Sequence, residues 1–127
     1  MPYVIAALFV AVAIVNLLPV TGVLSAARLE AGYGIPVGGP DLAILLRHRA
    51  LLFAVVGVLL AGAAVIPGWR GIATAAGLFS MLSFTLLVWL TPGANAQLAA
   101  IARVDAIASV ALIVAYVLHL RTPGVPS

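Results

Sequence analysis

The segment "DLAILLRHRALLFAVVGVLLAG" (residues 41–62) decides the fold class. Apart from Asp41 and three consecutive basic residues it is apolar throughout, and it has the ~20 residues that a membrane-spanning helix requires. Three further apolar segments of similar length follow the same pattern, and clusters of Gly, Pro, Thr and Asn separate the four. We therefore expect an all-α integral membrane protein, a single-domain bundle of four transmembrane helices over about 2–18, 41–66, 70–90 and 95–120.

The composition agrees with a membrane protein. Hydrophobic residues make up 65% of the 127 and charged residues 7%, with a mean hydropathy of +1.31, whereas soluble domains are about half apolar and about a quarter charged. The net charge of +3 comes from six basic and three acidic residues, and six are too few for a nucleic-acid-binding patch. Without cysteine, and with two histidines far apart in sequence, the chain offers no usual metal or iron–sulfur ligand set. We expect no metal, no cofactor and no nucleic-acid partner.

The helix ends carry recognisable signals. Residues 1–20 contain no Lys or Arg, so they lack the positive region of a secretory signal peptide and are expected to stay as the first helix. Pro19 ends that helix, and Pro67 with Gly68 ends the second. Asp41, which follows a Gly-Pro-rich stretch, is expected to cap the second helix at its N-terminus.

The connection between the first two helices is about twenty residues long, much longer than the other turns. Its apolar and polar residues alternate at helical spacing, which predicts a short amphipathic helix at the membrane surface. A plain connector is the alternative. The apolar positions are Val23, Leu24, Ala27 and Leu29, and the polar positions are Ser25, Arg28 and Glu30.

Most polar residues are predicted to lie at one level of the bundle. The 41–66 and 95–120 helices begin on the same side of the membrane, and each carries its charged residues about two turns from its start. The first helix ends on that side, and the long connection also emerges there. The resulting polar layer contains Asn16, Arg28, Glu30, Arg47, His48, Arg49, Arg103 and Asp105, whereas the opposite side has only Arg70, His119 and Arg121.

Two interpretations of Arg47, His48 and Arg49 stay open. In the first they anchor the 41–66 helix at the interface and lock it to the last helix, with Asp105 paired to one of its arginines and Glu30 or Asn16 satisfying another. In the second the layer is a cationic pocket for a lipid phosphate or for a quinone or isoprenoid head. The ligand-binding candidates are then Arg47, Arg49, Arg103, Asn16 and Glu30. His48 and Asp105 are the candidates for proton transfer in catalysis.

We therefore expect a small polytopic membrane protein that binds a lipid or other amphiphile, or that serves as an accessory subunit of a membrane complex. The alternative is a membrane-embedded acid–base enzyme acting on a lipid-like or isoprenoid substrate. A transporter or channel subunit is a third interpretation. The first helix, however, has Asn16 and no acid where small multidrug transporters need a glutamate. Membrane lipids or an amphiphilic small molecule are the expected partners, together with further copies of the chain or a larger membrane complex.

Arginine placement predicts the orientation. Four arginines lie on the side of the long connection and two on the other side, so the positive-inside rule puts the polar layer at the cytoplasm and both termini outside. The four are Arg28, Arg47, Arg49 and Arg103, and the two are Arg70 and Arg121.

Three stretches carry a resemblance that covers nearly the whole chain: "NLLPVTGVLSAARLEAGYGI" (16–35), "DLAILLRHRALLFAVVGVLL" (41–60) and "GLFSMLSFTLLVWL" (77–90). They resemble a family of small uncharacterised four-helix bacterial inner-membrane proteins and, more distantly, the DoxX-like group, with "LLRHRALLF" the most specific part. The resemblance implies a bacterial inner-membrane location and singles out Asn16, Arg28, Glu30 and the Arg47–Arg49 run. Some members carry the name phosphopantetheine adenylyltransferase, but this chain lacks the His-x-Gly-His motif of that soluble enzyme.

Overall fold

The computed structural model describes residues 2–23 and 26–122, and these are almost entirely helical. In chain order the elements are α1 (Pro2–Leu17), the 3-10 helix η1 (Leu18–Val23), α2 (Ala26–Tyr33), α3 (Pro40–Val65), the 3-10 helix η2 (Pro67–Trp69), α4 (Arg70–Leu90) and α5 (Ala96–Arg121). Neither described range contains a strand, so the expected all-α fold class is confirmed.

Four stretches of the described chain are long and apolar enough to cross a membrane: Pro2–Val20, Pro40–Val65, Pro67–Leu90 and Ala96–Arg121. α3 and α5 have 26 residues each and therefore rise about 39 Å, more than the ~30 Å of a bilayer's hydrocarbon core. Both helices thus extend beyond the hydrocarbon by a turn or two. The chain is a multi-pass membrane protein built as a four-helix transmembrane bundle.

The start of α3 differs from the expectation. Gly39 is the N-cap residue, Pro40 is the first helical residue, and Asp41 lies in the first turn without capping it, so the expected Asp41 cap is wrong. Proline suits this position because the first amide of a helix needs no partner. Asp41 still complements the positive end of the helix dipole from the first turn.

The expected amphipathic helix between the first two spans is present as α2, but it begins at Ala26 and runs to Tyr33. Its buried side chains are Leu29 and Tyr33, which are 2% and 8% exposed. Leu24 and Ser25, which we expected in this helix, lie outside the described residues. α2 packs on η1 and the beginning of α5, so it covers the end of the bundle.

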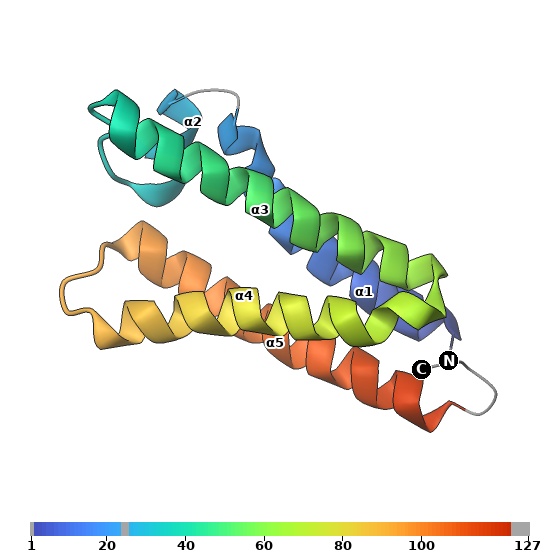
Figure 1. Ribbon diagram of the computed structural model, residues 1–127. Coiled ribbons are helices and arrows are strands. Elements are labelled where there is room, and N and C mark those ends of the chain that lie inside the picture. The colour runs from blue at the N-terminus through green and yellow to red at the C-terminus, as the bar shows by residue number, and fades with distance from the viewer. Residues whose placement is uncertain (1, 24–25, 123–127) are drawn as a thin grey trace.

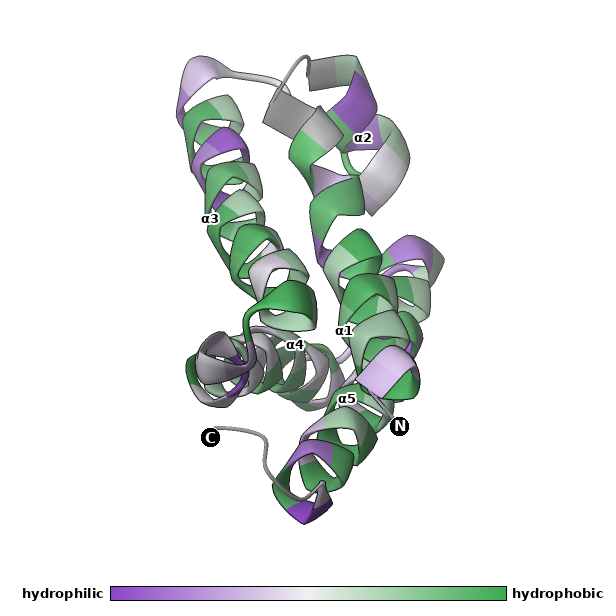
Figure 2. Ribbon diagram, turned by 90° about the vertical axis from the view of Figure 1, so that its right-hand side faces the viewer, coloured by the Kyte–Doolittle hydropathy of each residue, from purple (hydrophilic) through white to green (hydrophobic). Residues whose placement is uncertain are grey.

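The bundle consists of two helix pairs, α1 with α3 and α4 with α5, joined through α1–α5 and α3–α4 packing (Figure 1). α3 and α4 lie close together where η2 connects them, and they separate toward the end that carries α2 (Figure 1). Figure 2 shows hydrophobic residues along the helices and hydrophilic ones on α2 and on the part of α3 near it. The start of α1 and the end of α5 lie at the other end.

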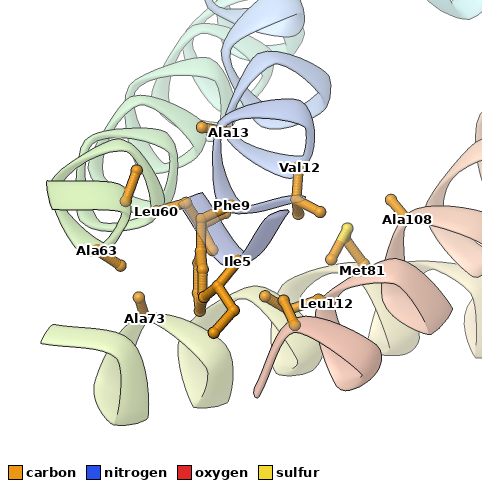
Figure 3. Packing of buried hydrophobic residues seen from close by; sticks show 12 residues of the cluster. Ile5, Phe9, Val12, Ala13, Leu60, Ala63, Ala73, Met81, Ala108 and Leu112 are labelled. Atoms are coloured by element: carbon orange, nitrogen blue, oxygen red, sulfur yellow. The ribbon is translucent and has the colours of Figure 1, made fainter. Parts of the chain in front are cut away.

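A cluster of buried hydrophobic residues packs α1, α3, α4 and α5 together (Figure 3). Phe9 of α1, Leu60 of α3 and Leu112 of α5 are completely buried there. Glycine lets the helices approach, because a Cβ at Gly77 would lie 2.8 Å from a methyl carbon of Leu112. Close backbone approach of this kind stabilises membrane bundles, where burial of apolar surface gives little driving force.

Candidate functional site

The three consecutive basic residues of α3 separate onto different faces of the helix. Successive helical positions point about 100° apart, so three in a row cannot share one direction. Arg47 and His48 are exposed, whereas Arg49 is half-buried and lies inside the bundle. From Arg47 to the end of α3 the helix rises about 28 Å, close to the hydrocarbon thickness, so Arg47 and His48 lie where the hydrocarbon core ends.

Arg49 sits in an aromatic cage. Its guanidinium carbon lies 4.7 Å from the ring centre of Phe53, 4.7 Å from that of Phe84 and 5.8 Å from that of Tyr33. Its Nε donates a hydrogen bond of 3.3 Å to the Tyr33 hydroxyl. Its Nη2 is buried and has no hydrogen-bond partner. Cation–π contacts stabilise a desolvated guanidinium by up to ~2 kcal/mol each, but they leave the in-plane N–H donors unused.

Asp105 of α5 faces the same region and is 6% exposed. Arg49 is close enough to attract it electrostatically, but the two form no ion pair, and no other described residue pairs with the carboxylate. The nearby hydroxyl of Ser109 donates to the backbone carbonyl of Asp105 instead, at 2.7 Å. The expected direct pairing of Asp105 with an arginine of α3 is therefore wrong. The two groups attract each other across a space that neither fills.

That space is a cavity of about 270 Å³, here called the Arg49 cavity. It lies between α1, α3 and α5, with Tyr33 of α2 at its top. Among the described residues that line it, Arg49 and Asp105 are the charged ones, and most of the remaining wall is apolar. The full lining is Val15, Leu18, Pro19, Tyr33, Arg49, Phe53, Ala100, Ile101, Val104 and Asp105.

An apolar groove of about 280 Å³, the α1–α5 groove, adjoins the Arg49 cavity. The two share Val15 and Val104 in their linings. The groove follows α5 from Val104 to Ala111, about 10 Å along the helix toward the middle of the bundle. Its lining is Ala11, Val12, Val15, Val104, Ile107, Ala108 and Ala111. Cavity and groove together have a charged end and an apolar extension.

Two further hollows adjoin the Arg49 cavity. A hollow of about 250 Å³ under α2 shares Leu18, Pro19, Tyr33 and Ile101 with it and reaches the exposed Arg28. On the other side of Arg49, a cleft of about 380 Å³ lies between α3 and α4 and contains Ser80 and Ser83. Arg49 and Phe53 line both this cleft and the Arg49 cavity, so these two side chains form the partition between them.

Hydrogen bonds fasten α2 over the cavity. Asn95, the N-cap of α5, accepts a 2.8 Å hydrogen bond from the Leu98 amide and donates to the carbonyls of Tyr33 and Gly34, at 2.9 and 3.2 Å. Gly34 has a φ of 67°, which suits glycine at the end of a helix. Asn95 thereby fixes the end of α2, and with it the Tyr33 ring beside Arg49.

The remaining predicted site residues lie elsewhere. Arg103 is exposed on α5, and Glu30 accepts a 2.9 Å hydrogen bond from the Val37 amide. Asn16 is buried and donates to the Val12 carbonyl at 2.9 Å and to the Met81 sulfur at 3.7 Å. Glu30 and Asn16 thus do not satisfy an arginine as we expected. His48 is exposed and lines none of the cavities described above, so it does not share the Arg49 cavity with Asp105.

A second buried polar group lies at the opposite end and was not expected from the sequence. Arg70, 5% exposed, donates to the α3 carbonyls of Ala63 at 2.9 Å and Ala64 at 3.3 Å. Its Nη1 lies 3.3 Å from Nδ1 of His119, which is 2% exposed, and its guanidinium faces the Phe9 ring at 5.6 Å. Because arginine only donates, Nδ1 of His119 is the acceptor. This group joins α1, α3, α4 and α5 and has a structural role.

The fold and site thus define a membrane-spanning four-helix protein with a charged cavity under its interfacial helix. The chain matches no protein family model, and no curated protein and no solved structure is significantly similar to it. The similarity to the small four-helix bacterial family and to the DoxX-like group therefore stays a prediction, carried by the three quoted stretches.

Proposed function

We propose that this protein binds one molecule of a membrane lipid or another amphiphile, with the polar head in the Arg49 cavity and an apolar chain along the α1–α5 groove. One observation carries the proposal: the half-buried Arg49 and the unpaired carboxylate of Asp105 line a cavity that adjoins an apolar groove. A pocket with a few placed polar groups and apolar walls is the usual form of a site for such a ligand.

The surroundings of Arg49 support a binding role over an anchoring role. An anchoring arginine extends its charge toward the headgroups, as the exposed Arg47 and Arg103 can do. Arg49 instead lies among three aromatic rings, where it is costly unless a partner compensates it. An anionic or carbonyl-bearing head that contacts the guanidinium would supply that partner as a charge-assisted hydrogen bond.

Acid–base catalysis has less support. His48, the imidazole we expected to act with Asp105, is exposed and outside the Arg49 cavity. A proton shuttle needs both groups within hydrogen-bond reach of one substrate. Binding alone accounts for the residues that line the cavity.

We also propose that the α2 end faces the cytoplasm of a bacterial inner membrane. The positive-inside rule applies to arginines at the membrane surface, so the inward-facing Arg49 and the buried Arg70 are left out of the count. The exposed arginines are then Arg28, Arg47 and Arg103 at the α2 end against Arg121 at the other. The bias toward the α2 end therefore survives the removal of both buried residues.

Native mass spectrometry tests the proposal on the protein extracted gently from its own membrane. We expect a defined small molecule to travel with the wild type and its occupancy to fall about tenfold in Arg49→Gln, as expected for the loss of one charge-assisted hydrogen bond. Arg47→Gln is the matched control, because it removes the same charge from an exposed position two residues earlier. A bare wild-type protein, or a stoichiometric protein complex kept by both variants, would refute lipid binding and favour the accessory-subunit alternative.

A further inference from the structure

The unpaired carboxylate of Asp105 restricts the chemistry of the head. A buried carboxylate is unfavourable unless a cation or hydrogen-bond donors compensate it. Within the described chain Arg49 attracts Asp105 only at a distance, and the nearby Ser109 hydroxyl is bonded to a backbone carbonyl. The carboxylate therefore keeps its acceptor positions for a donor that enters the cavity.

A head of one sign fits the Arg49 cavity poorly. A purely anionic head would be attracted by Arg49 and repelled by Asp105, and a purely cationic head would meet the opposite pair of forces. Both charges are best satisfied together when the head carries an anion and a cation that are separated by a short linker, because a charged donor bonds a carboxylate more strongly than a neutral hydroxyl does. The anion then meets the guanidinium of Arg49, and the cation meets Asp105.

Resting on the proposed function, we infer that the Arg49 cavity selects a zwitterionic lipid head with a phosphate and a primary ammonium, that is, a phosphoethanolamine head. The phosphate accepts from the guanidinium of Arg49, and the ammonium donates to the Asp105 carboxylate. A primary ammonium offers three N–H donors, whereas the quaternary ammonium of a phosphocholine head offers none. The rings of Tyr33, Phe53 and Phe84 are already occupied by the Arg49 guanidinium, so the cavity has no free aromatic cage for a choline.

The test uses the whole protein in nanodiscs made from equal amounts of phosphatidylethanolamine, phosphatidylglycerol and phosphatidylcholine with identical acyl chains. Native mass spectrometry after gentle release reports which lipid stays bound. We expect phosphatidylethanolamine to exceed each of the others about tenfold, as expected for one charge-assisted hydrogen bond. Asp105→Asn should abolish that preference without reducing phosphatidylglycerol binding. Asp41→Asn, an exposed acid on α3, is the matched control and should leave the preference unchanged.

Asp105→Glu distinguishes a loss of recognition from a loss of folding. Because it keeps the charge, we expect it to retain part of the preference for phosphatidylethanolamine. Equal occupancy by the three lipids in the wild type would overturn the head assignment and leave amphiphile binding standing. An equal loss of all three lipids in Asp105→Asn would do the same, because it would make Asp105 structural. A wild type that retains no lipid would overturn the proposed function itself.

Discussion

Replacement of Arg70 by methionine tests the polar group that joins the helices at the end opposite α2. Methionine keeps an unbranched apolar side chain of similar reach and removes every donor. Arg70→Met therefore deletes the two hydrogen bonds to the Ala63 and Ala64 carbonyls and the contact with His119. The two carbonyls lie in the last turn of α3, where the helix has no amides of its own to satisfy them.

The expected destabilisation follows from these contacts. Polar contacts between membrane helices average ~0.6 kcal/mol each, so three amount to about 2 kcal/mol. The charge of Arg70 strengthens its hydrogen bonds and its contact with the Phe9 ring, which increases the stability lost in the variant. Removing a buried cation that has no acid beside it offsets part of that loss of stability. We expect Arg70→Met to lower the free energy of unfolding by about 2–4 kcal/mol.

Reversible unfolding measures this change, with sodium dodecyl sulfate titrated into the protein in dodecyl maltoside micelles and helicity followed by circular dichroism. Arg121→Met is the control, because Arg121 is exposed at the end of α5 and its replacement should change the unfolding free energy by less than ~0.5 kcal/mol. Arg70→Met within ~0.5 kcal/mol of the wild type would refute the structural role of the Arg70 group.

Three further predictions concern the cavity, its cover and the helix packing. Tyr33→Phe removes the hydroxyl that accepts a hydrogen bond from Arg49 Nε. It should change the affinity for the bound amphiphile about threefold and leave the helicity unchanged. Titration followed by native mass spectrometry measures the affinity. Asn95→Ala removes the α5 cap and both hydrogen bonds to the end of α2. It should lower the free energy of unfolding by about 1–2 kcal/mol and speed proteolysis between α2 and α3. Unchanged proteolysis would mean that Asn95 does not hold α2 in place. Gly77→Leu introduces a side chain where a Cβ already lies 2.8 Å from Leu112, and we expect a loss of about 1–3 kcal/mol in the same unfolding assay, with the exposed Ala75→Leu as its control.

The fold could be predicted because its determinants are local in sequence. Length, hydropathy and the Pro and Gly breaks give the four spans, and the helix ends in the structure lie within a residue of those expected. Helical spacing also predicted an amphipathic helix in the long connection. Asp41 was misplaced because Gly39 and Pro40 together begin α3 two residues earlier than a polar cap would.

The site could be predicted only in part, because tertiary packing decides which way each polar side chain faces. Helix lengths predicted that Arg47, Arg49, Arg103 and Asp105 lie at one level. The rotation of α3 and α5 about their axes decides that Arg49 and Asp105 face inward and that Arg47 and Arg103 are exposed. The aromatic cage was missed because Phe53 and Phe84 look like ordinary apolar residues of a span. Tyr33 reaches the cavity only through the fold of α2.

The contact between Arg70 and His119 could have been predicted by comparing the levels of polar residues at the end opposite α2. Arg70 begins α4 and His119 lies in the last turn of α5, and two antiparallel helices bring such positions to the same level. The polar layer at the α2 end was predicted in the same way, from the levels of residues on neighbouring helices. The hydrogen bonds from Arg70 to the backbone carbonyls at the end of α3 could not be predicted from the sequence.

The most direct test of the central claim maps where the bound lipid lies. A phosphatidylethanolamine with a photoreactive diazirine in the middle of one acyl chain is cross-linked to the protein in nanodiscs, and the labelled residues are identified by peptide mass spectrometry. We expect adducts concentrated on Val104, Ile107 and Ala111 that are lost in Arg49→Gln and kept in Arg47→Gln. Labelling spread equally over exposed apolar residues of α4 such as Ile72 and Phe79, and unchanged in Arg49→Gln, would contradict it.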